Sequence, residues 1–536
     1  MKSVRSNWMK RAGTVLTLSL TSFLSQPHPM KTNCRLLAAI ILSLLGAGTS
    51  LAQPAPQPAP ADISRVNLPA HWWEKASASR YFVVSPSQKD RELLPIKDVA
   101  RTTAVLEQVR AQGFSAIHLV SPADGGVSFG GLDTTNHYAI RPDAGNMDDF
   151  RRTVQIAHSK GLAVTISYNL GYSSTDAPAW LKACDDVREG RSSPEARWFV
   201  WGASGDAPPP PQSIFFNPPG RGFWEYSARA KKHYWTRWGG VDGKDVDVRF
   251  PQFDWSSPEF LQEAERIVRF WMNTGIDGIM MDAVNWNSNS NWQKNRRHIT
   301  NVMASYGNVW IQGEGAGGFG EDPVPWIEEG GWNSVEDYGL GTWWVAGSHV
   351  ILKGFQTGDP RSIEPALRKS HDRVVQAGGS LFASALQFQD PVVPTRREAP
   401  HLGFAAQIGL GDLIGYDLRD MKVEPDGEQQ WLLRLKRDHP ALQQTGSRRQ
   451  VPTNADDKYY AFLRTAPGGG ERVLVVLNFQ RGFQKIEVNL SGLDTAGLVE
   501  LKTGEELPPA GTLRMGLYSY GYRFYLVKPP AKPAGK

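Results

Sequence analysis

Three short apolar stretches, each ending in a carboxylate, constrain the fold of this chain most strongly. The first comprises residues 275–284 and ends its apolar run at Asp282, the second leads to Glu314, and the third leads to Asp390. Residues 260–271, which precede the first stretch, place apolar side chains at helical spacing. A helix followed by a buried strand is typical of a parallel α/β unit. Because α/β barrels carry their chemistry at the carboxyl ends of the strands, we expect the three acids to converge on one face of a barrel.

A single acid after a strand has a plainer interpretation, in which Asp282 caps the helix that follows it. The repetition of the pattern favours a chemical role. Paired carboxylates at one face of a barrel suit the cleavage of a glycosidic bond. In that reaction one carboxylate either attacks the sugar or stabilises the sugar cation, and the other carboxyl group protonates the leaving oxygen.

The three stretches resemble motifs of the α-amylase superfamily, glycoside hydrolase family 13, and most closely those of its α-glucosidase and oligo-1,6-glucosidase branch. Residues 275–284 are similar to the nucleophile motif, Gly313-Glu314 to the acid/base motif, and Phe388-Gln389-Asp390 to the third motif, which is normally Asn-His-Asp. The resemblance implies three catalytic roles: nucleophile for Asp282, general acid/base for Glu314 and transition-state stabiliser for Asp390.

The same resemblance, which extends from Trp72 to Val527, implies the fold class α/β, with a (β/α)8 TIM barrel, an inserted subdomain after strand 3 and a C-terminal antiparallel β-sandwich. The predicted barrel covers residues 66–444 and includes the inserted subdomain at 171–250. The predicted sandwich covers residues 445–528, where short β-rich runs alternate with turn residues.

Seven residues are predicted to lie around the bound sugar: Asp133, His137, Asn169, Leu170, Met280, Gln389 and Arg397. Asp133 belongs to a segment similar to the family's Gly-Tyr-Asp loop, which implies a hydrogen bond to the non-reducing sugar. The alternative is a turn residue that stabilises its own loop. For Arg397 the alternative is a solvated surface position.

Three of these positions depart from the family's pattern. The Arg two residues before the nucleophile is Met280 here, the His after Asn169 is Leu170, and the His before Asp390 is Gln389. The first change matters because a nearby cation favours an ionised carboxylate. Gln389 can still donate to a sugar hydroxyl. Leu170 cannot, which suits a sugar that lacks the hydroxyl at carbon six, or a shifted pose.

Three functions are compatible with these residues. The first is a retaining α-glycoside hydrolase or transglycosylase that acts on α-glucosides or related oligosaccharides through a covalent glycosyl-enzyme intermediate. The sequence does not separate hydrolysis from transfer. The second is a catalytically impaired carbohydrate-binding member of the same family, which Met280 and Leu170 support. The third is a structural or interaction protein that uses the barrel as a scaffold.

The N-terminal region predicts export. Residues 1–52 form a signal peptide region with Met30 favoured as the true start, because basic residues precede the apolar run 36–45 and a small-residue cleavage site follows at Ala52. A retained membrane anchor is the alternative, although the run is shorter than the roughly 20 residues that a span needs. Residues 53–65 form a Pro/Ala linker. We therefore expect a periplasmic or secreted protein without stable membrane insertion.

Composition limits the partners further. The net charge is +5 and there is no basic stripe, so a nucleic-acid partner is not expected. Cleavage after Ala52 leaves Cys184 as the only cysteine, which excludes an intramolecular disulfide and predicts a buried thiol. The loop after the first barrel strand lacks an acidic, Gly-rich pattern, so we expect no metal, and no cofactor. We expect a monomer, with a disordered tail at residues 529–536.

Overall fold

The computed structural model describes residues 68–88, 92–125, 133–202, 224–237, 250–282, 284, 292–314, 322–336, 350–382, 401–411, 413–416 and 426–530. All of them belong to one compact unit, residues 59–536. The predicted signal peptide region, the whole of the predicted linker and most of the predicted tail lie outside the described residues, as do Gln389, Asp390 and Arg397.

Eight parallel strands form one sheet, in the order β12-β11-β10-β9-β5-β2-β1-β13. They are β1 (Ala78–Val83), β2 (Ala116–Val120), β5 (Ala163–Tyr168), β9 (Gly278–Met281), β10 (Trp310–Gly313), β11 (Ser334–Glu336), β12 (Ser380–Phe382) and β13 (Ile414–Tyr416). Neighbours follow the order of the chain, and the last strand, β13, pairs in parallel with the first, β1, where Ala78 faces Ile414. This is the strand order of an eight-stranded parallel barrel. Seven of its eight neighbouring pairs are present among the described residues, and β12 and β13 lie at the two ends of the sheet. This confirms the predicted (β/α)8 barrel.

Aromatic contacts identify the inner face of the barrel. The ring centroid of His118 on β2 lies 4.4 Å from that of Tyr81 on β1 and 6.5 Å from that of Trp310 on β10. Strands β2 and β10 are not neighbours in the sheet, so the contact between His118 and Trp310 crosses the interior. Side chains alternate along a strand, so Gln312 and Glu314 share the inward direction of Trp310.

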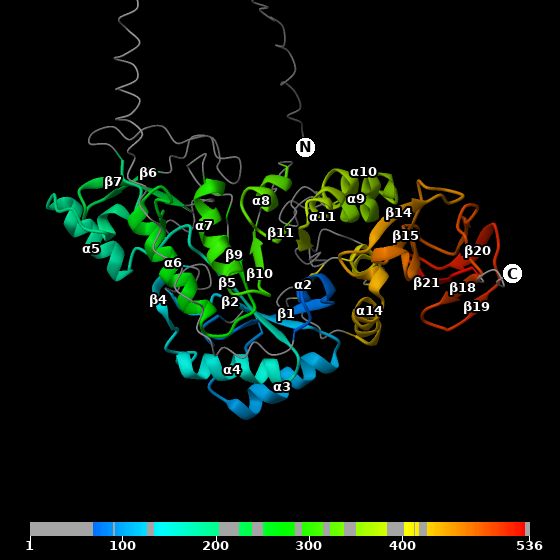
Figure 1. Ribbon diagram of the computed structural model, residues 1–536, viewed down its shortest axis with the longest axis horizontal. Helices are drawn as coiled ribbons and strands as arrows, with labels where there is room; N and C mark the ends of the chain where they lie inside the picture. Colours follow the sequence, from blue (N-terminus) through cyan, green and yellow to red (C-terminus); the bar gives the residue numbers. More distant parts are fainter. Residues whose placement is uncertain are drawn as a thin grey trace, which may run out of the picture. The chain divides into compact units, whose positions relative to one another are not determined.

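The helices that follow the strands cover the outer face of the sheet (Figure 1). They include α3 (Val99–Ala111), α4 (Met147–Ser159), α6 (Pro258–Met272), α7 (Trp292–Ala304), α8 (Val324–Glu328), α10 (Ile363–Lys369), α11 (His371–Gln376), α12 (Leu402–Leu410) and α14 (Gly427–Asp438). Two of them show why the sequence forms helices here. The side chain of Asn146 accepts hydrogen bonds from two backbone amides at the start of α4. Helix α6 buries Phe260, Ile267 and Trp271 along one stripe, as its apolar spacing predicts.

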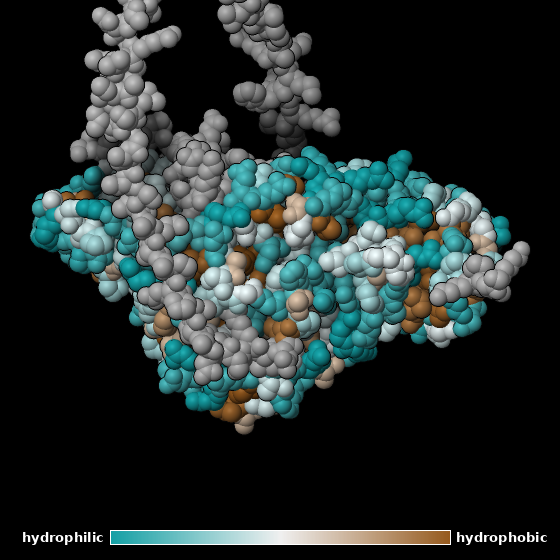
Figure 2. Space-filling view, in the orientation of Figure 1, coloured by the Kyte–Doolittle hydropathy of each residue, from teal (hydrophilic) through white to brown (hydrophobic). Residues whose placement is uncertain are grey.

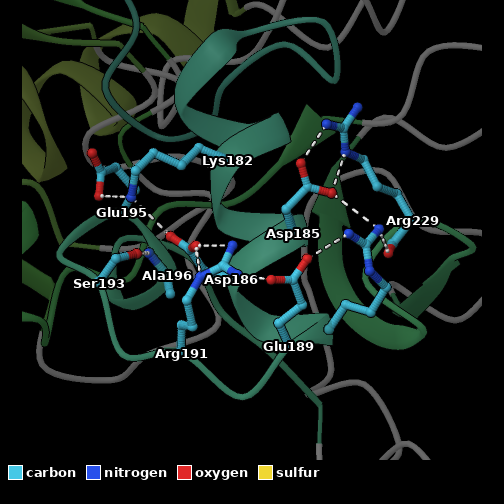
Figure 3. Close-up of polar contacts among 10 residues, drawn as sticks. Lys182, Asp185, Asp186, Glu189, Arg191, Ser193, Glu195, Ala196 and Arg229 are labelled. Atoms are coloured by element: carbon cyan, nitrogen blue, oxygen red, sulfur yellow. Dashed lines mark hydrogen bonds and ion pairs between the residues drawn. The ribbon is translucent and has the colours of Figure 1, made fainter.

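The inserted subdomain follows the third barrel strand, β5, as predicted. It contains α5 (Pro178–Arg188), β6 (Trp224–Ser227), β7 (Lys232–Arg237) and β8 (Phe250–Pro251). Figure 3 shows the charged network that ties α5 to the turn after it and to Arg229. Asp186 accepts from Lys182 Nζ and from Arg191 Nε, each at 2.8 Å. The hydrogen bond from Lys182 contributes most to holding the pKa of Asp186 well below its usual range.

The C-terminal segment forms the predicted antiparallel sandwich. One sheet has the order β14-β15-β16-β21-β18-β19, and β17 pairs with β20 in the other. The strands are β14 (Ser447–Val451), β15 (Tyr459–Thr465), β16 (Arg472–Asn478), β17 (Gln484–Asn489), β18 (Gly497–Glu500), β19 (Glu506–Leu507), β20 (Thr512–Leu517) and β21 (Tyr522–Lys528). Leu474, Val488 and other apolar residues form its core. Arg464, fully buried, donates to the carbonyl of Leu410 in α12 at 2.7 Å, which anchors the sandwich to the barrel.

The face drawn in Figure 2 is mostly hydrophilic, with hydrophobic residues interspersed. Within the described residues, no helix combines the length and the apolar character needed to cross a membrane.

Candidate active site

The carboxyl ends of β5, β9 and β10 lie side by side and bring three predicted site residues together. Tyr168 at the end of β5 is paired with Met281 at the end of β9. The residues that follow them are Asn169 and Asp282, and the backbone N–H of Asp282 donates to the carbonyl of Tyr168 at 2.9 Å. The N–H of Glu314, after β10, donates to the carbonyl of Met281 at 3.0 Å. Asn169, Asp282 and Glu314 therefore follow the ends of three consecutive strands.

A hydrogen bond fixes the orientation of the Asp282 carboxylate. Asn169 donates from Nδ2 to Oδ2 of Asp282 at 3.2 Å, while its own Oδ1 accepts from the backbone N–H of Gly171 at 2.6 Å. Only 3% of Asn169 is exposed, so its amide is held in one orientation. The plainer interpretation of Asp282 as a helix cap stays open, because residue 283 and residues 285–291 lie outside the described residues and α7 is described from Trp292 onward.

A further acid, which sequence reasoning did not single out, extends this row. Strands β10 and β11 pair Gly313 with Val335, so Glu336 occupies the position next to Glu314. Glu336 is 5% exposed and has the same inward direction as Glu314. A signal was present in the sequence, since residues 334–336 also form a short stretch that ends in an acid.

Met280 lies inside the barrel, two residues before Asp282. It is paired with Ser167 on β5 and with Gln312 on β10, and it packs against the apolar cluster around Trp310. A thioether carries no charge, so Met280 gives the carboxylate of Asp282 none of the electrostatic support that a cation at this position would give.

Asp133 is buried near the start of β4 (Thr134–Ile140), which pairs with β3 (Ala123–Gly125). Its Oδ2 accepts from the Ser174 hydroxyl at 3.4 Å, and its Oδ1 has no hydrogen-bond partner among the described residues. Burial raises the pKa of Asp133 to about 6. The carboxylate is thus an available acceptor at neutral pH, as its predicted contact with a sugar hydroxyl requires.

The structure does not place His137 with the strand-end carboxylates. Its Nδ1 lies 2.6 Å from the hydroxyl of Tyr168, and its carbonyl accepts from Trp271 Nε1 at 3.0 Å. Tyr168 points outward from β5, opposite to Asn169. His137 therefore sits between β5 and α6, where burial lowers its pKa to about 4. Its predicted sugar contact stays a prediction.

Leu170 is also a core residue. Its side chain is fully buried in the main apolar cluster, and its carbonyl accepts from Trp255 Nε1 at 3.1 Å. A side chain with no exposed surface can act on the sugar only through its neighbours. The predicted contact of Leu170 with substrate stays a prediction. Gln389, Asp390 and Arg397 lie outside the described residues, so their predicted roles stay predictions as well.

Two remaining expectations concern metals and the cysteine. In the described ranges, no group of three or more His, Cys, Asp or Glu side chains could hold a metal ion. Cys184 is fully buried in α5, as predicted, and burial raises the pKa of its thiol to about 11.

Comparison with known families gives two matches. Residues 98–310 match the family described as alpha amylase, catalytic domain, and residues 449–525 match the maltogenic amylase C-terminal domain. The first match includes β2, β5 and β9 and ends at the start of β10, and the second falls within the sandwich.

Individual relatives agree with these matches. An α-glucosidase of Culex pipiens is 27% identical over 217 residues, which are 40% of this chain and 34% of the relative. A trehalose synthase of Thermus thermophilus is 30% identical over 156 residues, which are 29% of this chain and 14% of the relative. The matched stretches thus span about a third or less of these relatives. Among solved structures, the trehalulose synthase of Pseudomonas mesoacidophila MX-45 has a TM-score of 0.63 at 16% identity, covering 85% of this chain and 99% of that one.

Proposed function

The chain belongs to the α-amylase superfamily, glycoside hydrolase family 13, and from this premise we propose that it is a retaining α-glycoside hydrolase or transglycosylase acting on α-glucosides or related oligosaccharides. The observation that carries the proposal is the adjacency of Asp282 and Glu314 at the ends of neighbouring strands. Neighbouring strands lie about 4.8 Å apart. Retaining enzymes hold their two carboxyl groups about 5–5.5 Å apart and inverting enzymes about 6.5–9.5 Å apart, so this adjacency supports the retaining geometry.

The proposed reaction has two displacements. A carboxylate oxygen of Asp282 attacks the anomeric carbon, the glycosidic C–O bond breaks, and Glu314 gives its proton to the departing oxygen. In the second step an acceptor hydroxyl attacks the anomeric carbon, Glu314 takes the proton of that hydroxyl, and Asp282 is released. Asn169 holds the nucleophile in place throughout by its hydrogen bond to Oδ2. We retain Asp390 as the proposed stabiliser of the sugar cation.

The acceptor decides between hydrolysis and transfer. Water gives hydrolysis and a sugar hydroxyl gives transglycosylation, and both use the same two carboxyl groups. The relatives carry both kinds of name, α-glucosidase and trehalose synthase. Both outcomes therefore belong to the proposal.

A catalytically impaired carbohydrate-binding protein is the second candidate, and Met280 is the observation that favours it. The carboxyl groups of Asp282 and Glu314 follow neighbouring strands. Because Met280 provides no cation between them, their negative charges repel one another. A protein in this state would still hold sugar through Asp133 but would turn it over slowly.

We also propose, on the sequence of residues 1–65, that the protein is exported to the periplasm or beyond the cell after cleavage at Ala52. We propose further that it acts as a monomer on glycosides, with no nucleic-acid partner and no stable membrane insertion.

A substrate panel tests the proposed function. The mature protein and the Asp282→Asn variant are incubated with maltose, isomaltose, sucrose, trehalose and nitrophenyl α-glucosides, and products are separated by chromatography. We expect the wild type to turn over at least one compound and the variant none. Calorimetric binding of a sugar without turnover would support the impaired binding protein instead, and neither binding nor turnover would contradict both candidates.

A further inference from the structure

A row of mostly polar side chains crosses the inside of the barrel, and three of its five members stand two residues before the acids Asp282, Glu314 and Glu336. The paired residues across five neighbouring strands are Ser167, Met280, Gln312, Ser334 and Ser380. The Ser and Gln members are all at most 4% exposed. Barrel interiors are usually filled by bulky branched apolar residues, so polar side chains in four of the five positions need an explanation.

Gln312 is the member for which packing gives no explanation. It has no exposed surface, and neither its Nε2 nor its Oε1 has a hydrogen-bond partner among the described residues. A buried amide left unpaired lowers stability, because its desolvation is not offset. Met or Leu would fill this position without that cost. Residues that violate the packing rules in this way are expected at functional sites.

The position of Gln312 relates it to both carboxylates. It precedes Glu314 by two residues on β10 and shares its inward direction. It is also paired with Met280, which precedes Asp282 by two residues on β9. An amide offers two donor hydrogens and one acceptor oxygen, so one side chain at this position can serve both acids.

We propose that Gln312 is a positioning residue for the carboxylate pair. With substrate bound, its amide hydrogen-bonds the carboxyl groups of Asp282 and Glu314, and as a neutral donor it supplies part of the support that Met280 cannot give. The inference rests on the proposed function and deepens it, because it concerns the same site.

The test compares apolar substitutions at two buried glutamines. Gln312→Met and Gln312→Leu remove the amide at the proposed position. Gln407→Met is the matched control, because Gln407 in α12 is 1% exposed and its Nε2 has no partner among the described residues. For each protein Tm, kcat and KM are measured on the best compound of the panel, beside the wild type and Asp282→Asn.

We expect kcat to fall about tenfold or more in both Gln312 variants, the effect of losing a hydrogen bond to a charged group. KM should change less than about threefold and Tm should stay the same or rise, since an unpaired buried amide has been removed. Gln407→Met should keep the wild-type kcat. This separation of kcat from Tm is one that a purely structural glutamine would not produce.

The outcomes are distinguishable. If the wild type turns over substrate, Asp282→Asn does not, and the Gln312 variants match the wild type, the inference about Gln312 is overturned while the proposed function stands. If both apolar variants showed a lower kcat together with a lower Tm, Gln312 would be a structural residue and the inference would also be overturned. Absence of wild-type turnover, or full activity in Asp282→Asn, would remove the proposed function and the inference with it.

Discussion

Asn169 donates a hydrogen bond from Nδ2 to Oδ2 of Asp282 at 3.2 Å, across the gap between β5 and β9. The donor cannot turn away, because Oδ1 of the same amide accepts from Gly171 at 2.6 Å. A neutral amide in a fixed orientation thus supports the carboxylate that is proposed to attack the sugar.

The first prediction concerns this donor. Asn169→Ala should lower kcat by about tenfold to a hundredfold, because a hydrogen bond to a charged group contributes about 1.5–3 kcal/mol. Steady-state kinetics on the preferred glycoside measures the effect. Asn489→Ala is the control and should retain full activity, because this residue ends β17 in the sandwich and its Oδ1 accepts from the backbone N–H and the hydroxyl of Ser491. An unchanged kcat in Asn169→Ala would mean that Asp282 does not depend on this bond.

The second prediction uses the raised pKa of Asp133. Since its pKa is about 6 in the folded protein, the carboxylate loses its negative charge as the pH falls through that value. A protonated acid is a weaker acceptor for a sugar hydroxyl, so the Kd of the sugar should rise below pH 6. Calorimetric titration of the Asp282→Asn protein at pH 5 and pH 7.5 measures this, and adding Asp133→Asn should make the Kd high at both values. A pH-independent Kd in the parent would argue that Asp133 only stabilises its own loop.

The Asp133 carboxyl group also makes the stability of the fold depend on pH, in the direction opposite to its effect on sugar binding. The unfolded chain has the ordinary pKa near 3.8, so the folded protein binds a proton more tightly between pH 4 and 6. Its contribution to stability is therefore present at low pH and decreases as the pH rises through this window. Urea unfolding across the window should show a smaller decrease in Asp133→Asn.

The third prediction separates a core role from a substrate role for His137. His137→Phe removes the hydrogen bond to Tyr168 and should lower the free energy of unfolding at pH 7.5 by about 1–3 kcal/mol, with kcat and KM unchanged. In the wild type the folded pKa of about 4 lies below the unfolded value of 6.5, so stability falls as the pH decreases from 6.5 towards 4. That fall should be smaller in the variant. A raised KM with unchanged Tm would instead support the sugar contact expected from the sequence.

The fourth prediction concerns the missing cation. Met280→Arg places a positive charge two residues before Asp282, inside the barrel, and we expect kcat to rise because the charge favours the ionised nucleophile. Tm should fall, because a buried cation loses its hydration. Met281→Leu on the outward side of the same strand is the control for repacking and should leave kcat unchanged. A folded Met280→Arg protein with lower kcat would show that this site works without a cation.

Particular residues show how far sequence reasoning extends. The helix at residues 260–271 was predictable because its apolar side chains recur at helical spacing, and the structure has α6 (Pro258–Met272) over these residues. The convergence of Asp282 and Glu314 followed from a general property of parallel barrels, in which strands end on one face.

The remainder required tertiary information. Glu336 ends a strand of three residues, too short for its periodicity to be read. His137 lies on β4, and the sequence did not indicate that its ring turns towards the outer layer at Tyr168. The unpaired amide of Gln312 depends on which side chains surround it in space, and that information is absent from the strand itself.

Trapping the covalent intermediate shows directly whether Asp282 is the nucleophile. The wild type and Asp282→Asn are incubated with 5-fluoro-α-glucosyl fluoride, and the intact proteins and their peptides are weighed by mass spectrometry. We expect one fluoroglucosyl adduct on the wild type, located on the Asp282 side chain, and none on the variant. An adduct on another residue, or turnover of glycosides by Asp282→Asn at the wild-type rate, would contradict this expectation.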